Sequence, residues 1–257
     1  MDARLILHTF LALLLLLVPA GALYLLEPKK LVKFLIVMAR MMVQLLALCL
    51  LVWILVRVNS PWLSMVWLAA VAVGSSWLVQ KRCAVQGRVQ GRQLMPAIAV
   101  GLFLGVLIVG QWLLVLTLPV RAFDARWFVP IMALLMGHSV SMLIRGLTTW
   151  LSSLRADEQQ YEFLRGNGQT HLKALQPFMR RALLAVVQPT MANFSVLALT
   201  SMPLMLVGML LGGLTPINCF ALMLFMVVGC VAASVLSLAI TILVADRVLF
   251  DQFGKLR

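Results

Sequence analysis

Polar side chains inside otherwise apolar runs are the residues of this sequence with the clearest potential for chemistry. Arg40 and Gln44 are four residues apart, so on a helix they share one face. His138, Ser141 and Arg145 follow the spacing i, i+3, i+7, which also places them along one face. A later apolar run carries further polar positions. The polar residues that we consider as candidates for lining a binding site or pathway are Arg40, Gln44, His138, Ser141, Gln188, Asn193 and Ser195.

No set of residues has the spacing of a catalytic or metal centre. The three histidines lie in separate segments, the four cysteines form no CxxC pair, and the phosphate-binding pattern GxxxxGK[ST] is absent. We therefore expect no enzymatic activity, no catalytic residue and no cofactor in this chain; ATP with Mg²⁺, where required, would be bound by a separate ATPase. The 16 methionines either fill gaps in packing or hold a soft metal such as Cu(I), and both interpretations stay open.

The amino-acid composition is typical of a membrane protein and not of a soluble protein. Of the 257 residues 63% are hydrophobic and only 11% are charged, and the mean hydropathy is +1.05. A soluble domain carries about 25% charged residues, so a soluble enzyme, a disordered chain and a disulfide scaffold are excluded. The apolar residues form unbroken runs and do not alternate, which excludes an outer-membrane barrel. The net charge of +13 comes from basic clusters between apolar runs, an arrangement typical of helical membrane proteins and not of nucleic-acid binding.

Seven apolar segments have the length that a membrane-spanning helix needs, about 20 residues. No charged residue occurs from Ala182 to Ala245, a stretch that fits two spans with a turn at Gly212–Pro216. Pro189 and Pro203 predict that the sixth span is kinked or broken. We predict an all-α, polytopic bundle forming a single permease domain over residues 1–257, whose first five spans are Leu5–Leu26, Phe34–Val56, Trp62–Gln80, Leu94–Val120 and Phe128–Ile144.

The basic residues predict the orientation of these spans. The linkers after the first, third and fifth spans, together with the C-terminal tail, carry 16 of the 21 Lys and Arg residues. Because cytoplasmic loops of membrane proteins are enriched in Lys and Arg, the N-terminus is predicted outside and the C-terminus in the cytoplasm.

The linker before the sixth span, Leu151–Arg181, differs from the other linkers. It is long, mixed in charge and periodic, and Gly166-Asn167-Gly168 predicts a turn between two helices. We expect a cytoplasmic helical hairpin that contacts a partner, with a solvated interfacial hairpin as the alternative. The candidate coupling residues are Glu162, Leu164, Gly166 and Gly168.

The order of these features resembles the FetB-like permease family, the membrane subunits of ABC transporters linked to iron export in bacteria, with plant relatives in aluminium tolerance. The resemblance covers roughly Lys33 to Phe250. The residues that carry it are Ala39-Arg40, Gln44-Leu45, Gln80-Lys81-Arg82, Pro130-Ile131, Gly137, Glu162, Leu164, Gly168, Pro189-Thr190, the stretch from Leu199 to Pro203, Gly208 and Pro216.

The sequence departs from the family where a hard cation would need ligands. Met191, Ala192 and Asn193 follow Pro189-Thr190 where the family tends to carry an acidic residue and a lysine, and Thr215 replaces the acid of its Asp-Pro turn. His138 stands where the family usually has Asn, and Leu204 where it usually has Gly. Because iron prefers oxygen ligands such as carboxylates, these residues do not support iron as the substrate.

Together these observations lead us to expect a permease subunit of the bacterial inner membrane that forms a homodimer and works with a separate ABC ATPase. The resemblance implies a metal exporter. The alternatives are an exporter of an apolar or lipid-like compound, or a membrane scaffold or sensor that transports nothing. An integral-membrane enzyme is disfavoured because the predicted spans contain no acid/base pair. The expected partners are the ATPase, a second copy of the chain and membrane lipid, with no nucleic acid.

Overall fold

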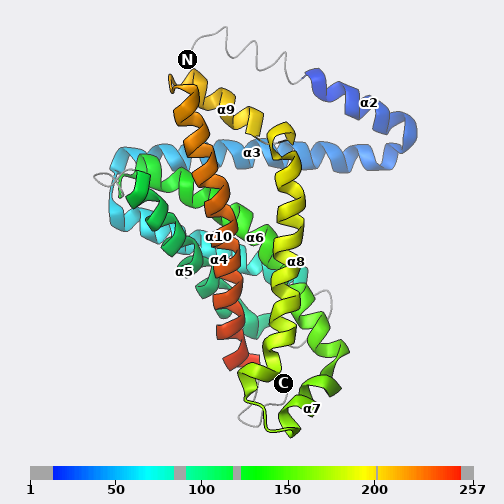
Figure 1. The fold of residues 1–257 in the computed structure, drawn as a ribbon. Helices are drawn as coiled ribbons and strands as arrows, with labels where there is room; N and C mark the ends of the chain where they lie inside the picture. Colours follow the sequence, from blue (N-terminus) through cyan, green and yellow to red (C-terminus); the bar gives the residue numbers. More distant parts are fainter. Residues whose placement is uncertain (1–13, 84–90, 118–122, 201, 250–257) are drawn as a thin grey trace. The chain divides into compact units, whose positions relative to one another are not determined.

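The computed structural model describes residues 14–83, 91–117, 123–200 and 202–249, and every regular element in these ranges is a helix (Figure 1). The all-α class is thus confirmed for the described part of the chain. The elements are η1 (Leu14–Leu16), α2 (Leu17–Leu26), α3 (Pro28–Val58), α4 (Pro61–Cys83), α5 (Gly91–Thr117), α6 (Ala125–Ala156), α7 (Glu158–Gly166), α8 (His171–Thr200), α9 (Met202–Leu211) and α10 (Pro216–Leu249).

Five stretches within these helices are long and apolar enough to cross a membrane. They are Leu31–Val58, Pro61–Cys83, Leu94–Thr117, Ala125–Ala156 and Pro216–Val248. The first predicted span begins in residues outside the described ranges, and α2 supplies only ten residues of it. The seven-span count and the orientation therefore stay predictions.

The chain divides into two compact units, residues 1–58 and 59–257. Within its described residues, the first unit consists of η1, α2 and α3. The 31 residues of α3 correspond to a length of about 46 Å, more than the roughly 30 Å of a hydrocarbon core. Near the end of α3 the guanidinium of Arg57 lies 5.1 Å from the ring centroid of Trp53, the pairing of a basic and an aromatic residue common at membrane boundaries.

The second unit is a bundle in which successive long helices alternate in direction. At one end the side-chain oxygen of Asn59 accepts a hydrogen bond from the backbone N–H of Ala125 (2.9 Å), and at the other Cys83 contacts the carbonyl of Ile144. Thus α4 and α6 run parallel to each other. The Thr190 hydroxyl contacts the sulfur of Met142 at 3.8 Å, so α8 returns along α6 in the opposite direction.

Glycines bring α5 and α10 into close contact. A methyl group added at Gly105 would lie 2.7 Å from the backbone Cα of Ser237, and one at Gly101 would lie 2.9 Å from the carbonyl oxygen of Ser237. Helices in lipid gain no hydrophobic driving force from associating, so small residues that let backbones approach are their main means of packing. The backbones of α5 and α10 therefore approach each other closely within the second unit.

The predicted turns are present, and the helices beside the hairpin are longer than the apolar runs indicated. Gly168 (φ +77°) and Gly213 (φ +85°) adopt the left-handed conformation after α7 and α9, which glycine accepts without strain. The sixth predicted span is covered by α8 and α9, and position 201 between them lies outside the described residues, so the predicted kink or break stays a prediction. The helix α6 continues beyond the charge of Arg145 because Trp150 and its apolar neighbours on that face remain buried.

Candidate functional site

A chain of hydrogen bonds ties the hairpin to the last long helix. The Tyr161 hydroxyl on α7 lies 2.7 Å from Nδ1 of His171, the first residue of α8. On the other side of the same ring, Nε2 lies 2.6 Å from Oδ1 of Asp246 near the end of α10. The hairpin and α10 therefore meet at one end of the bundle, as Figure 1 also shows.

We call the hydrogen-bonded chain Tyr161–His171–Asp246 the joint. Its side chains lie mostly out of solvent, so they hold α7, α8 and α10 together. Tyr161 is buried, and the side chains of His171 and Asp246 are only 28% and 12% exposed. Burial raises the pKa of Tyr161 above its ordinary value; the guanidinium of Arg165 lowers it and the carboxylate of Asp246 raises it. Because the hydroxyl stays protonated at neutral pH, it serves as a neutral hydrogen-bonding partner of the imidazole.

A second contact closes the base of the hairpin. The guanidinium of Arg181 on α8 pairs with the carboxylate of Asp157, which lies between α6 and α7. In the turn, the backbone N–H groups of Asn167, Gly168 and Gln169 donate to carbonyls in the last part of α7. The structure confirms the predicted turn between two helices.

The predicted coupling residues lie on the outside of this hairpin. Glu162 is exposed, Leu164 is half-buried, and Gly166 and Gly168 flank the turn. Phe163, which the sequence analysis did not select, is 68% exposed on α7. Phe163 thus adds an apolar contact point to the exposed polar residues of α7.

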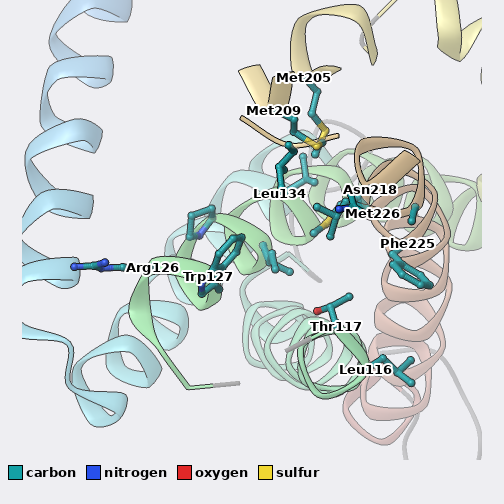
Figure 2. Close-up of a pocket in the computed structure, with 15 residues that line it drawn as sticks. Leu116, Thr117, Arg126, Trp127, Leu134, Met205, Met209, Asn218, Phe225 and Met226 are labelled. Carbon is teal, nitrogen blue, oxygen red and sulfur yellow. The ribbon is translucent and has the colours of Figure 1, made fainter. Parts of the chain in front are cut away.

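A pocket of about 620 Å³ lies at the opposite end of the second unit, between α5, α6, α9 and α10. We call it the distal pocket. Met205 and Met209 of α9 form one side of it, opposite Leu134 of α6, while Asn218 and Met226 come from α10 (Figure 2). Its volume is within the range of small-molecule sites, about 300–1,000 Å³.

The distal pocket continues into the predicted polar stripe of α6. Pro130 and Leu134 line the pocket, and Gly137, Ser141 and Arg145 follow at spacings of three and four residues. All five residues are exposed, so they form one open face of α6 that runs from the pocket towards the hairpin end. The hydroxyl of Ser141 on this face donates to the carbonyl of Gly137.

The other predicted pathway residues of the second unit lie on α6 and α8. His138 is half-buried, and its Nε2 has no hydrogen-bond partner among the described residues. Gln188 and Asn193 on α8 are both exposed, whereas Thr190 between them is buried and donates to the carbonyl of Val186. Because α8 packs along α6, these polar positions belong to two neighbouring helices, and their role in a pathway stays a prediction.

The remaining two pathway candidates lie in the first unit, and one lies beyond the described side chains. Arg40 and Gln44 are exposed on α3, one turn apart. The backbone of Ser195 belongs to α8, but its side chain lies outside the described part. Whether these residues line the same pathway as His138 stays a prediction.

Sequence reasoning missed the joint and the distal pocket. One signal for the joint was available, because Asp246 is the acid that ends the charge-free stretch from Ala182 to Ala245. Its partner His171 is 75 residues away along the chain, a separation that no local pattern reports. The distal pocket joins residues of four helices, a combination that no local pattern reports.

The long apolar helices, the closely packed glycines and the polar hairpin define a multi-pass helical membrane protein. The model of the family described as "Uncharacterised protein family (UPF0014)" matches residues 6–250, so the chain belongs to this family. The chain is also similar to Protein ALUMINUM SENSITIVE 3 of Arabidopsis thaliana, with 28% identity over 194 residues. The match covers 72% of this chain and 65% of that protein. No solved structure matches the chain. The narrower resemblance to FetB-like permeases stays a prediction.

Proposed function

We propose that this chain is the membrane-spanning permease subunit of an ABC-type transporter of the bacterial inner membrane. Two copies of the chain would assemble with two separate ATPase subunits, which bind and hydrolyse ATP. Membership of the family, the similarity to the plant protein and the lack of a phosphate-binding motif in this sequence support the proposal.

The observation that carries the proposal is the construction of the hairpin. A segment that transmits force from a partner needs an exposed contact surface and a firm connection to the spans. Phe163 supplies an exposed apolar group, and the chain from Tyr161 through His171 to Asp246 supplies the connection. A minimal loop between two spans needs neither feature.

In this proposal ATP binding closes the ATPases and displaces the hairpin. The displacement passes through the joint into α10, whose 34 residues correspond to about 51 Å. The other end of α10 lines the distal pocket with Asn218 and Met226. One helix thereby connects the partner surface to the pocket, and the assembly switches between two access states.

Site-specific photo-cross-linking tests the partner contact. A photoreactive phenylalanine analogue replaces Phe163 in intact cells, and the cross-linked product is identified by mass spectrometry. We expect an ATPase chain that contains a phosphate-binding GxxxxGK[ST] motif. The matched control replaces Phe123, an exposed Phe just before α6 and so at the other end of the bundle, where no ATPase cross-link is expected. No ATPase cross-link from position 163 would favour the scaffold or sensor alternative.

A further inference from the structure

The distal pocket offers its occupant a mostly apolar interior. Three of its lining residues, Met205, Met209 and Met226, present flexible thioethers, and Phe225 adds an aromatic ring. Methionine adapts its shape to different apolar ligands, as on promiscuous binding surfaces. The interior therefore suits a flexible hydrocarbon body better than a rigid polar solute.

Few polar groups remain available inside the pocket. The hydroxyl of Thr117 already donates to the carbonyl of Leu113 at 2.8 Å. Asn218 is exposed and supplies one side-chain amide. The described residues that line the pocket include no acid, and so they offer none of the carboxylate ligands that a hard metal cation needs.

Among the described lining residues, the charged one, Arg126, lies at the edge of the pocket. Arg126 is exposed, and in Figure 2 its guanidinium points away from the pocket interior and from the methionines. Within the described ranges, no carboxylate oxygen lies within 4.0 Å of the Arg126 guanidinium. The positive charge at the mouth is therefore available to a ligand, whereas the interior is neutral.

The position of Trp127 explains why an apolar interior and a charged edge occur in one pocket. Trp127 follows Arg126 in the first turn of α6 and also lines the pocket. Trp residues are enriched where the hydrocarbon layer meets water. In the proposed topology, Trp127 therefore places the pocket near this boundary, which is where an amphiphile lies in a bilayer.

We propose that the distal pocket binds a single-chain amphiphile with an anionic head group. The apolar chain lies among Met205, Met209 and Met226, and the head lies at the edge of the pocket on the side of Arg126. The inference rests on the proposed function, because it assigns the substrate class of that transporter. The open face of α6 from Gly137 to Arg145 continues from the pocket and carries cationic and neutral groups only.

Binding of radiolabelled palmitate to the purified chain in nanodiscs of neutral lipid tests the proposal, since this assay requires no ATPase. We expect saturable binding at mildly alkaline pH, where the fatty acid is ionised. The neutral analogue hexadecanol should bind at least about fivefold more weakly, the ratio that corresponds to about 1 kcal/mol for one exposed charge pair.

Two variants with matched controls locate the site. Ala221→Trp fills the pocket from α10 and should abolish palmitate binding, whereas Ala232→Trp places the same ring at an exposed position of α10 away from the pocket. Arg126→Gln should weaken palmitate binding about fivefold and leave hexadecanol binding unchanged. Lys81→Gln, which removes a cation at the hairpin end, should change neither affinity.

Three results would overturn the proposal. The first is that the Ala221→Trp variant still binds palmitate. The second is that palmitate and hexadecanol bind with equal affinity and that Arg126→Gln changes neither affinity. The third is displacement of palmitate by a stoichiometric amount of two-chain phosphatidylglycerol, which would identify a structural membrane lipid as the occupant. Failure of the proposed function would be distinguishable, because palmitate would still bind while position 163 gave no ATPase cross-link.

Discussion

At the scale of single residues, the joint formed by Tyr161, His171 and Asp246 connects three helices through side-chain hydrogen bonds. Both ring nitrogens of His171 face a hydrogen-bond partner, one on each side. A partly buried imidazole between a hydroxyl and a carboxylate holds a single orientation, and so fixes the start of α8 against the end of α10.

His171→Ala should therefore destabilise the protein by about 1–3 kcal/mol, because it leaves the carboxylate of Asp246 and the hydroxyl of Tyr161 without this partner. The midpoint of thermal unfolding in detergent measures the loss. Lys173→Ala, at an exposed position two residues further along α8, is the control and should have little effect. Equal midpoints for the His171 variant and the wild-type protein would contradict a structural joint.

The raised pKa of Tyr161 predicts a pH dependence of stability. The folded chain holds this proton more tightly than the unfolded chain, in which tyrosine titrates near pH 10. The contribution is complete below about pH 10 and is lost as the pH rises through the raised pKa of the folded state. Unfolding midpoints of the wild type measured between about pH 9 and 11 should fall more steeply than those of Tyr161→Phe. Parallel curves would contradict the assignment.

At the scale of elements, the close contact between α5 and α10 contributes to the stability of the bundle. Gly105→Ala should destabilise the protein by about 1–3 kcal/mol, because the added methyl group would overlap the backbone of Ser237. Gly74→Ala on α4 is the control, since a methyl group there meets no atom within 4 Å. That variant should be neutral or slightly stabilising through helix propensity. Similar losses for both variants would contradict the close packing.

The hairpin should transmit the state of the ATPase to the distal pocket. In the purified complex, a cysteine at position 209 should react with a thiol reagent at a rate that changes when ATP is added. Glu162→Ala, Leu164→Ala and Gly168→Ala should each reduce this change while ATP hydrolysis continues. Gln169→Ala, at an exposed position beside the turn, is the control. An unchanged response in all three variants would show that the hairpin does not couple the two sites.

Sequence patterns predicted which segments form helices better than they predicted the residues at which those helices end. The hairpin turn followed from Gly166-Asn167-Gly168, because a turn of this kind depends on local backbone preferences. The continuation of α6 to Ala156 did not follow, because buried residues such as Trp150 extend a helix beyond the last apolar run. The joint and the distal pocket required tertiary structure, since each unites residues from helices distant in sequence.

At the scale of the whole molecule, the basic residues predict one orientation in the membrane. Lys81 lies at the hairpin end of the second unit with its ammonium 3.6 Å from the centroid of the Trp77 ring, and Arg247 lies near the end of α10 at the same end. Both residues lie at the end that the sequence predicts to be cytoplasmic, and the same predicted orientation would place the distal pocket on the outer side of the membrane.

Cysteine labelling in intact cells tests this orientation, in a variant that lacks the native cysteines. Cysteines at Asp2, Asp124 and Leu214 should react with an impermeant thiol reagent, and those at Arg88 and Lys255 should react only after the membrane is opened. Labelling at position 88 in sealed cells would contradict the predicted topology. It would also place the distal pocket on the opposite side.

The central claim, that this chain is one half of an ATP-driven permease, is tested most directly by the mass of the native assembly. Native mass spectrometry of the protein purified from its own membranes counts the chains in the complex. The proposal predicts two copies of this 28.4 kDa chain together with two copies of an ATP-binding subunit. An assembly in which this chain occurs without any ATP-binding subunit would contradict the claim.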